Sequence, residues 1–313
     1  MKKILCIDSN HTVLHETLIQ AGFQCDLFWD KSKEELLEIL PNYDCIVIRS
    51  KFKITKDVIN KATKLKCIGR VGAGLENIDV AYAESKGIVC VNAPEGNRDA
   101  VGEHALGMLL MLLNHLKRAD AEVRQGIWKR AENRGYEIGG KTIGVIGLGN
   151  MGSAFAQRLQ GFNCKILAYD KYKTNYGNDY IKESTLDEIY EQADIVSIHL
   201  PLTPETNYYI NDVFIKAFKK NIYVINTARG KCLNTTDLVS HLKSGKILGA
   251  CLDVLEYEST SFEQVDVAHL PEPMQYLINS DKVILTPHIA GWTHESNYKM
   301  SKCIAEKMIR VLL

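Results

Sequence analysis

Short apolar segments rich in β-branched residues alternate with helix-like segments along nearly the whole chain. This alternation predicts parallel sheets covered by helices, because parallel neighbours need a crossover connection. The expected strands are 3–7, 24–28, 45–49, 67–71 and 88–91, then 142–146, 165–169, 195–199, 222–226, 249–254 and 283–286. With 313 residues the chain is too long for one typical core. We therefore expect the α/β class, with two doubly wound parallel-sheet domains.

Three helices have clear signals in the sequence. Residues 32–40 predict a helix with Ser32 as its N-cap and Glu35 as the capping-box partner. Residues 97–124 predict one long helix with a crowded apolar face, and residues 296–311 predict the last helix of the chain.

Composition limits the partners and the compartment. Lysine plus arginine equals aspartate plus glutamate at 38 each, which argues against a general attraction to nucleic acid or an anionic membrane. Nine scattered cysteines without a Cys-x-x-Cys pair favour free thiols in a reducing compartment. The N-terminus lacks a secretory apolar core, and the most apolar helix candidate, 105–116, is too short to cross a bilayer. We expect a cytoplasmic protein, and the histidine spacings predict no metal site.

A glycine-rich loop points to a cofactor. Gly147-Leu148-Gly149-Asn150-Met151-Gly152 is a G-x-G-x-x-G that directly follows an expected strand and opens an expected helix. Such glycines let backbone amides and a helix N-terminus approach a pyrophosphate. Asp170 ends the next strand, 18 residues beyond Gly152, where a carboxylate can bind both ribose hydroxyls. The pattern predicts NAD rather than NADP, although Lys171 could soften that preference.

Three polar residues each follow an expected strand of the second series: Arg229, Glu258 and His288. The carboxyl ends of parallel strands line one crevice, so residues remote in sequence can meet there. Hydride transfer from an alcohol needs a base for the hydroxyl proton, which suits histidine, and a guanidinium can bind a substrate carboxylate with two parallel bonds. The alternatives left open by the spacing alone are a surface salt bridge and an ordinary loop histidine.

Several longer motifs occur together and in order. They are Val71-Gly72-Ala73-Gly74, Asn92-Ala93-Pro94, Glu103-His104-Ala105-Leu106-Gly107, Gly140-Lys141-Thr142, residues 193–203, Asn226-Thr227-Ala228-Arg229-Gly230, Leu252-Asp253-Val254 and Leu285-Thr286-Pro287-His288-Ile289-Ala290-Gly291. In this combination the sequence resembles the D-isomer-specific 2-hydroxyacid dehydrogenase family, and within it the short form of D-3-phosphoglycerate dehydrogenases most.

The resemblance implies a role for each candidate residue. Arg229 would orient the substrate, Glu258 would be the carboxylate partner of the catalytic histidine, and His288 would donate and accept the proton. The cofactor-binding residues that it implies are Gly147, Gly149, Asn150, Met151, Gly152, Asp170, Pro201, Thr206, Thr227, Ala228, Asp253, Ala290 and Gly291. Among these, Asp253 would hold the nicotinamide amide.

The resemblance also implies the domain organisation. Residues 97–286 would form a Rossmann NAD-binding domain that includes the long helix 97–124, through which family members usually dimerise. Residues 1–96 together with 287–313 would form a discontinuous, flavodoxin-like substrate-binding domain. Residues 128–130 (Trp128, Lys129 and Arg130) would reach the active site of the partner subunit, with a simple surface loop as the alternative.

The substrate depends on a second set of residues. Arg49, Lys51 and Lys53 alternate, so in an extended segment their side chains would point the same way and could form a phosphate pocket. The alternative is a solvated cationic edge. The expected substrate-binding residues are Arg49, Ser50, Lys51, Val71, Gly72, Ala73 and Gly74. The resemblance implies that the backbone of Gly72–Gly74 takes the substrate carboxylate.

We therefore expect an NAD-dependent oxidoreductase that acts on a small D-2-hydroxy acid, with 3-phosphoglycerate and serine biosynthesis as the first interpretation. A glyoxylate or hydroxypyruvate reductase is the runner-up, and an NAD(H)-gated binding protein is a minor alternative. Ser259 replaces the proline that commonly follows the catalytic glutamate, and segment 257–274 is longer than usual. Because the chain ends at Leu313, we expect no regulatory C-terminal domain and no feedback by serine through one.

Overall fold

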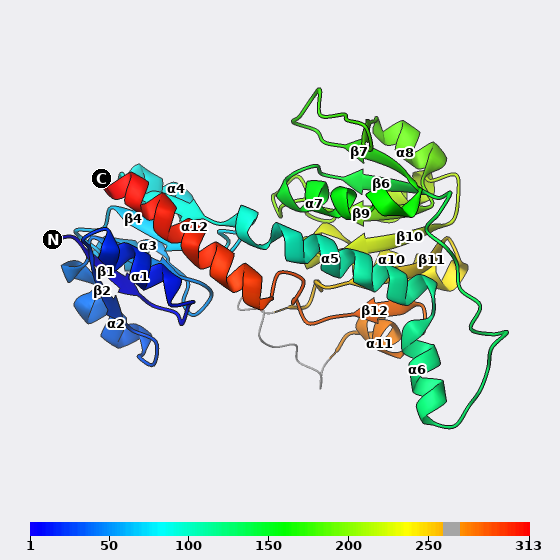
Figure 1. The fold of residues 1–313 in the computed structure, drawn as a ribbon, viewed down its shortest axis with the longest axis horizontal. Helices are drawn as coiled ribbons and strands as arrows, with labels where there is room; N and C mark the ends of the chain where they lie inside the picture. Colours follow the sequence, from blue (N-terminus) through cyan, green and yellow to red (C-terminus); the bar gives the residue numbers. More distant parts are fainter. Residues whose placement is uncertain (259–269) are drawn as a thin grey trace. The chain divides into compact units, whose positions relative to one another are not determined.

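The computed structural model describes residues 1–258 and 270–313 (Figure 1). They form two compact units. The first unit comprises Met1–Arg98 and Trp292–Leu313, and the second unit comprises Asp99–Gly291. The departures noted at Ser259 and in most of segment 257–274 lie outside the described residues.

The first unit is built on a parallel sheet of five strands. They are β1 (Lys3–Cys6), β2 (Gln24–Leu27), β3 (Cys45–Ile48), β4 (Cys67–Arg70) and β5 (Val89–Asn92). Their order, β2-β1-β3-β4-β5, is the flavodoxin-like doubly wound order. The interior strands β1 and β3 are short apolar runs because both faces of the sheet are covered, whereas the edge strand β2 contains Gln24 and Asp26.

Alternate residues of β1 show how helices cover those two faces. Ile4 and Cys6 pack in one apolar cluster with α1 (Val13–Gln20) and the C-terminal helix α12 (His294–Leu312), which lie side by side in Figure 1. Leu5 and Ile7 pack in the other cluster. That cluster includes residues of α2 (Lys33–Ile39), the 3-10 turn η1 (Leu40–Asn42), α3 (Lys56–Lys61) and α4 (Val80–Ser85).

The sequence signal for α2 is confirmed in detail. The Glu35 amide donates to Ser32 Oγ at 3.2 Å, and the Ser32 amide donates to Glu35 Oε2 at 2.8 Å. This reciprocal capping box satisfies amides that the first turn of a helix otherwise leaves unbonded.

The second unit contains a parallel sheet of seven strands. They are β6 (Thr142–Ile146), β7 (Lys165–Tyr169), β8 (Lys182–Glu183), β9 (Ile195–Ile198), β10 (Ile222–Asn226), β11 (Ile247–Leu252) and β12 (Val283–Leu285). The order is β12-β11-β10-β9-β6-β7-β8, so the winding reverses between β6 and β9. This is the doubly wound arrangement in which ligands bind at the reversal point. Strand β8 was not expected, because its two residues are charged and give no apolar pattern; both are exposed in the structure.

Helices and short turns complete the second unit. They are α5 (Pro94–Leu113), α6 (Leu116–Arg124), α7 (Asn150–Arg158), η2 (Gln160–Phe162), α8 (Leu186–Gln192), α9 (Asp212–Ala217), η3 (Gly230–Cys232), α10 (Thr235–Ser244) and α11 (Glu272–Asn279), with the first turn of α5 in the first unit. The apolar face of α5 packs with α7 against one side of the sheet, and α8 to α11 cover the other (Figure 1). The expected α/β class with two parallel sheets is confirmed.

The expected long helix 97–124 is two helices. Between α5 and α6 stands His115, whose φ of 53° lies in the left-handed region. The Tyr136 amide donates a 3.0 Å hydrogen bond to the Leu113 carbonyl, so the last turn of α5 bonds outside the helix. The prediction of a single helix is therefore wrong.

Among the helices of residues 1–258 and 270–313, none combines the length and the apolar character that spanning a membrane requires.

Candidate active site

The glycine loop turns sharply between β6 and α7. Gly147 has a φ of +91°, and a Cβ built there would lie 2.6 Å from the carbonyl oxygen of His199. A Cβ at Gly152 would lie 2.1 Å from the carbonyl oxygen of Gly147. Both positions therefore require glycine, because the turn and the start of α7 are packed backbone to backbone.

The middle glycine of the loop has a different surrounding. A Cβ built at Gly149 would meet no heavy atom of the described chain within 4 Å. Gly149 is the N-cap of α7, so Asn150 and Met151 form the first turn, where backbone amides have no partner within the helix. A helix N-terminus with such an opening fits the pyrophosphate of a dinucleotide.

Asp170 follows β7 and holds the glycine loop. Its carboxylate accepts hydrogen bonds from the amides of Leu148 at 2.9 Å and of Tyr172 at 3.0 Å. A carboxylate offers about four acceptor positions. The side chain can therefore hold the loop and still bind the hydroxyl groups of a ribose.

Further expected cofactor contacts lie in the loops after β9 and β10. The Thr227 hydroxyl is buried and has no hydrogen-bond partner within residues 1–258 and 270–313. A buried hydroxyl normally has a partner, so this atom fits a contact to a bound cofactor. The Thr206 hydroxyl instead donates to the Pro201 carbonyl at 2.6 Å and thus stabilises its own loop. Ala228 is buried, and its amide donates to Asn226 at 3.0 Å.

Glu258 and His288 meet at the carboxyl end of the sheet. His288 Nδ1 lies 2.6 Å from Glu258 Oε2, and the two side chains are 23% and 13% exposed, respectively. The other carboxylate oxygen of Glu258 accepts from the Leu255 amide, which fixes its direction. β11 and β12 are neighbours in the sheet, so residues 30 positions apart in sequence come into contact.

Asp253 holds the segment that carries His288. Its buried carboxylate accepts hydrogen bonds from the Thr286 hydroxyl at 2.6 Å and from the amides of Ile289 at 2.8 Å and Ala290 at 2.9 Å. The His288 amide donates to the Asp253 carbonyl at 2.8 Å. His288 has a φ of 55°, an unusual value for a residue with a side chain, and these bonds stabilise it.

Thr286 and His104 were not singled out from the sequence. His104 Nε2 lies 3.1 Å from the Thr286 hydroxyl, and Thr286 in turn donates to Asp253. Both residues lie inside motifs that the sequence analysis quoted. A histidine on an otherwise apolar helix face was the signal available for His104.

Arg229 lies next to the loop that carries Glu258. Its Nη1 donates to the Ala228 carbonyl at 2.6 Å, and the Asn226 side-chain amide donates to the Arg229 carbonyl at 3.1 Å. A Cβ at Gly230 would lie 2.1 Å from the carbonyl carbon of Leu255, so the two loops touch through their backbones. This close approach brings the chain at Arg229 beside the segment that leads to Glu258.

His199 is a half-buried histidine whose backbone carbonyl packs against Gly147 of the glycine loop. Its Nε2 lies 2.8 Å from the Ser197 hydroxyl, and its Nδ1 has no partner in the part of the chain that is described. Burial lowers the pKa of His199 from 6.5 to about 4. The residue is therefore neutral near pH 7, and its ring packs 5.6 Å from the ring of Phe155.

The cationic residues 49–53 were expected to form an extended segment, but they do not continue β3. The Asp8 carboxylate accepts from the amides of Arg49 at 2.7 Å and Lys51 at 3.2 Å, and this bends the chain after Ile48. The Lys51 ammonium donates to the Trp29 carbonyl, whereas Lys53 is exposed. The three side chains therefore do not line one face of a strand.

Arg49 has a partner that the sequence did not suggest. Its guanidinium lies 4.2 Å from the centre of the Trp292 ring, and burial lowers its pKa, an effect partly offset by Asp8. Nearby, the Gly72 carbonyl accepts from the Ala93 amide at 2.8 Å. A Cβ at Gly72 would collide with the Arg70 guanidinium, a second cation that sequence reasoning missed.

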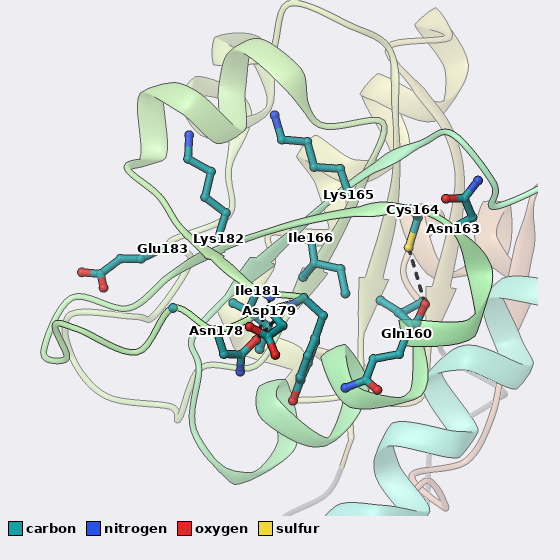
Figure 2. A pocket seen from close by; sticks show the side chains of 13 residues that line it. Gln160, Asn163, Cys164, Lys165, Ile166, Asn178, Asp179, Ile181, Lys182 and Glu183 are labelled. Atoms are coloured by element: carbon teal, nitrogen blue, oxygen red, sulfur yellow. Dashed lines mark hydrogen bonds between the residues drawn. The ribbon is translucent and has the colours of Figure 1, made fainter.

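A pocket of about 770 Å³ opens elsewhere on the second unit, where β7 begins and β8 forms the edge of the sheet. Figure 2 shows its polar lining, which includes Gln160, Lys165, Asn178 and Glu183. Of the described residues that line it, none is an expected site residue. The expected cofactor residues that lie on the second unit gather instead at the carboxyl ends of the strands.

Comparison with known proteins gives the family. The sequence-family model of the D-isomer specific 2-hydroxyacid dehydrogenase NAD binding domain matches residues 106–290. The chain is 38% identical over 315 residues to D-3-phosphoglycerate dehydrogenase of Methanocaldococcus jannaschii, an alignment that covers 100% of this chain and 58% of that protein. It is 36% identical over 282 residues to hydroxypyruvate reductase of Thermotoga maritima, covering 90% of this chain and 88% of that protein.

A solved structure agrees with these matches. D-lactate dehydrogenase with NAD+ from Lactobacillus jensenii has a TM-score of 0.80 at 27% identity, covering 98% of this chain and 97% of that one. This chain spans little more than half the length of several of the phosphoglycerate dehydrogenases that it matches. It belongs to the D-isomer specific 2-hydroxyacid dehydrogenase family, and residues 106–290 are the NAD-binding domain of that family.

Proposed function

We propose that the protein is an NAD-dependent oxidoreductase that transfers a hydride between nicotinamide and C2 of a D-2-hydroxy acid or its 2-keto acid. The observation that carries the proposal is the 2.6 Å contact between His288 Nδ1 and Glu258 Oε2, beside an NAD-binding crevice. A histidine held by a carboxylate at the carboxyl end of a doubly wound sheet is suited to general acid–base work.

In the proposed mechanism, NAD supplies or accepts the hydride when it is bound. Nδ1 of His288 faces Glu258, so the proton exchanged with the substrate oxygen is assigned to Nε2. Glu258 fixes the tautomer and the direction of the ring. Arg229 is assigned the substrate carboxylate and the polarisation of the adjacent carbonyl. The open space at Gly149 and the Thr227 hydroxyl support cofactor binding at the same end of the sheet.

The substrate that we propose first is 3-phosphoglycerate with its product 3-phosphohydroxypyruvate, a step of serine biosynthesis. The similarity to phosphoglycerate dehydrogenases supports it, as does the cationic segment at Arg49, Ser50 and Lys51 with the backbone of Val71–Gly74. The second candidate is hydroxypyruvate or glyoxylate. It is favoured by the match to a hydroxypyruvate reductase along 88% of that enzyme's length.

Steady-state kinetics with three 2-keto acids test the reaction and the substrate together. Purified protein is assayed with NADH and phosphohydroxypyruvate, hydroxypyruvate or glyoxylate, and the three values of kcat/KM are compared. We expect turnover that is lost in His288→Asn, since general acid–base catalysis contributes about 100-fold or more. Turnover unchanged in that variant contradicts the proposed mechanism. If NADH binds but no 2-keto acid is reduced, the minor alternative of an NAD(H)-gated binding protein is favoured.

A substitution in the first unit separates the two substrate classes. Arg49→Met removes a charge but keeps an apolar contact with Trp292. If Arg49 binds a phosphate, the KM for phosphohydroxypyruvate should rise about tenfold or more, because a charged hydrogen bond contributes about 1.5–3 kcal/mol. The KM for glyoxylate should change little. Lys56→Met, which removes an exposed lysine beside Tyr82, is the matched control.

We also propose a homodimer in the cytoplasm. The exposed apolar residues Leu116 and Val123 of α6 and the exposed Trp128 support a subunit contact there, and the nine free cysteines support a reducing compartment. A role for Lys129 and Arg130 in the partner's active site is part of the same proposal. Light scattering of the purified chain tests the dimer; a monomer at micromolar concentration contradicts it.

A further inference from the structure

Three exposed side chains form a bridge between the loops that follow β7 and β9. Glu205, in the loop after β9, forms an ion pair with Lys171, and one of its carboxylate oxygens accepts a 2.6 Å hydrogen bond from the Tyr172 hydroxyl. β7 and β9 are the two neighbours of β6, whose carboxyl end carries the glycine loop. The bridge therefore joins the two loops on either side of the nucleotide crevice.

The bridge begins one residue after the carboxylate expected to bind ribose. Asp170 accepts the Leu148 and Tyr172 amides, and Lys171 and Lys173 are the cations that follow it directly. Both cations are already engaged, because Lys171 is paired with Glu205 and Lys173 donates to the Leu148 carbonyl at 2.7 Å. Consistent with the ion pair, the pKa of Glu205 is lowered by Lys171 and the pKa of Lys171 is raised by Glu205.

The two dinucleotides differ in what they require at this position. The free ribose hydroxyls of NAD suit a carboxylate, whereas the 2′-phosphate of NADP needs a cation that can turn toward it. Lys171 is the residue placed to supply that cation. In the structure the Lys171 ammonium is instead paired with Glu205.

We propose that Glu205 is a second determinant of the preference for NAD over NADP. It holds the Lys171 ammonium in an ion pair across the crevice and adds its own negative charge to that of Asp170. The inference deepens the proposed function and rests on its use of NAD. It concerns cofactor binding and is independent of which 2-hydroxy acid reacts.

Direct binding measurements on Glu205→Gln test the inference. The dissociation constants for NADH and NADPH are obtained from the fluorescence of the reduced nicotinamide, without a 2-keto acid. We expect NADPH to bind about fivefold more tightly than to the unaltered protein, the order of magnitude that an exposed ion pair can contribute. NADH binding should change less than about twofold, and the gain for NADPH should shrink at high salt.

A second substitution shows whether the effect acts through the lysine. In a Lys171→Met background, Glu205→Gln should no longer improve NADPH binding. If the improvement persists there, repulsion by Glu205 alone explains it and the sequestration of Lys171 is overturned. Glu272→Gln removes a comparable exposed pair with Lys243, 3.4 Å long, that joins α10 and α11. This control should leave both dissociation constants unchanged.

The same titrations distinguish failure of this inference from failure of the proposed function. If NADH binds but no 2-keto acid is turned over, the proposed reaction is overturned. The role of Glu205 is then still decided by the NADPH titration of Glu205→Gln. Normal NADH binding with an unchanged NADPH dissociation constant in Glu205→Gln overturns the role of Glu205. If the unaltered protein binds NADPH as tightly as NADH, the preference itself is absent and the inference is overturned.

Discussion

Replacing Gly230 by alanine tests how far the site depends on contact between two loops. A Cβ at Gly230 would lie 2.1 Å from both the carbonyl carbon and oxygen of Leu255, and 2.5 Å from the amide nitrogen of Glu256. All three are backbone atoms, so no side chain can rotate to make room. Glu256 is itself fixed, because its carboxylate accepts from the Tyr208 hydroxyl at 2.7 Å and the Thr235 amide at 3.1 Å.

The distances set the size of the expected displacement. Ordinary Cβ contacts begin at 3.4 Å, so the two backbones must separate by about 1.3 Å, the difference between 3.4 and 2.1 Å. Gly230 follows Arg229 directly, and Leu255 is three residues before Glu258, so the separation displaces one relative to the other. An error of about 1 Å in such a site can lower kcat/KM about 100-fold, and overpacking costs about 1–3 kcal/mol of folding free energy.

Kinetics and thermal unfolding of Gly230→Ala separate these two effects. We expect kcat/KM with NADH and the preferred 2-keto acid to fall about 100-fold in protein that is still folded at the assay temperature. Gly161→Ala is the control, since a Cβ there meets nothing within 4 Å of the described chain. A variant that loses stability but keeps its kcat/KM would refute the reasoning.

Two further predictions concern His199 and Asp253. The pKa of His199 is lowered by burial from 6.5 to about 4, so on acidification the unfolded chain gains a proton first and unfolding is favoured between these pH values. This difference in pKa corresponds to about 3 kcal/mol of unfolding free energy. In urea denaturation, the unfolding free energy of His199→Gln should therefore fall less between pH 6.5 and pH 4 than that of the unaltered protein. An equal fall in both proteins contradicts this prediction. Asp253→Asn replaces one of the two carboxylate oxygens that together accept three hydrogen bonds with an NH2 group, which cannot accept. It should lower the free energy of unfolding by about 1–3 kcal/mol and lower kcat more than it changes KM, because the segment that holds His288 loosens. The exposed Asp281→Asn is its control, and equal kinetics in the two variants would contradict the role of Asp253.

Much of the fold was predictable because its signals are local. Parallel strands covered on both faces are continuous apolar runs, so ten of the expected segments, among them β1 and β10, coincide with observed strands to within about one residue at either end. The capping box at Ser32 and the glycine loop depend on residues three to five positions apart. β11 shifted toward its N-terminus, since Asp253 leaves the strand to hold the segment around His288.

Other features depend on contacts between distant residues. The sequence near His115 contains no glycine or proline that would end a helix, and the apolar pattern resumes at Leu116. The break is accompanied by a hydrogen bond from the distant Tyr136 amide to the Leu113 carbonyl. The bend after β3 is caused by Asp8, 41 residues from Arg49. At the candidate site the residue types and the strand ends were predictable, whereas the role of Asp253 in holding the histidine segment was not.

The short strand β8 has a consequence for how copies of the protein meet one another. It forms one border of the seven-stranded sheet and consists of Lys182 and Glu183, both exposed. A bare border of a sheet offers unpaired amides and carbonyls to any extended chain nearby, and brevity and charge reduce that risk of aggregation. The two charged residues that kept β8 from being predicted as a strand thus also protect this edge of the sheet from aggregation at high protein concentration.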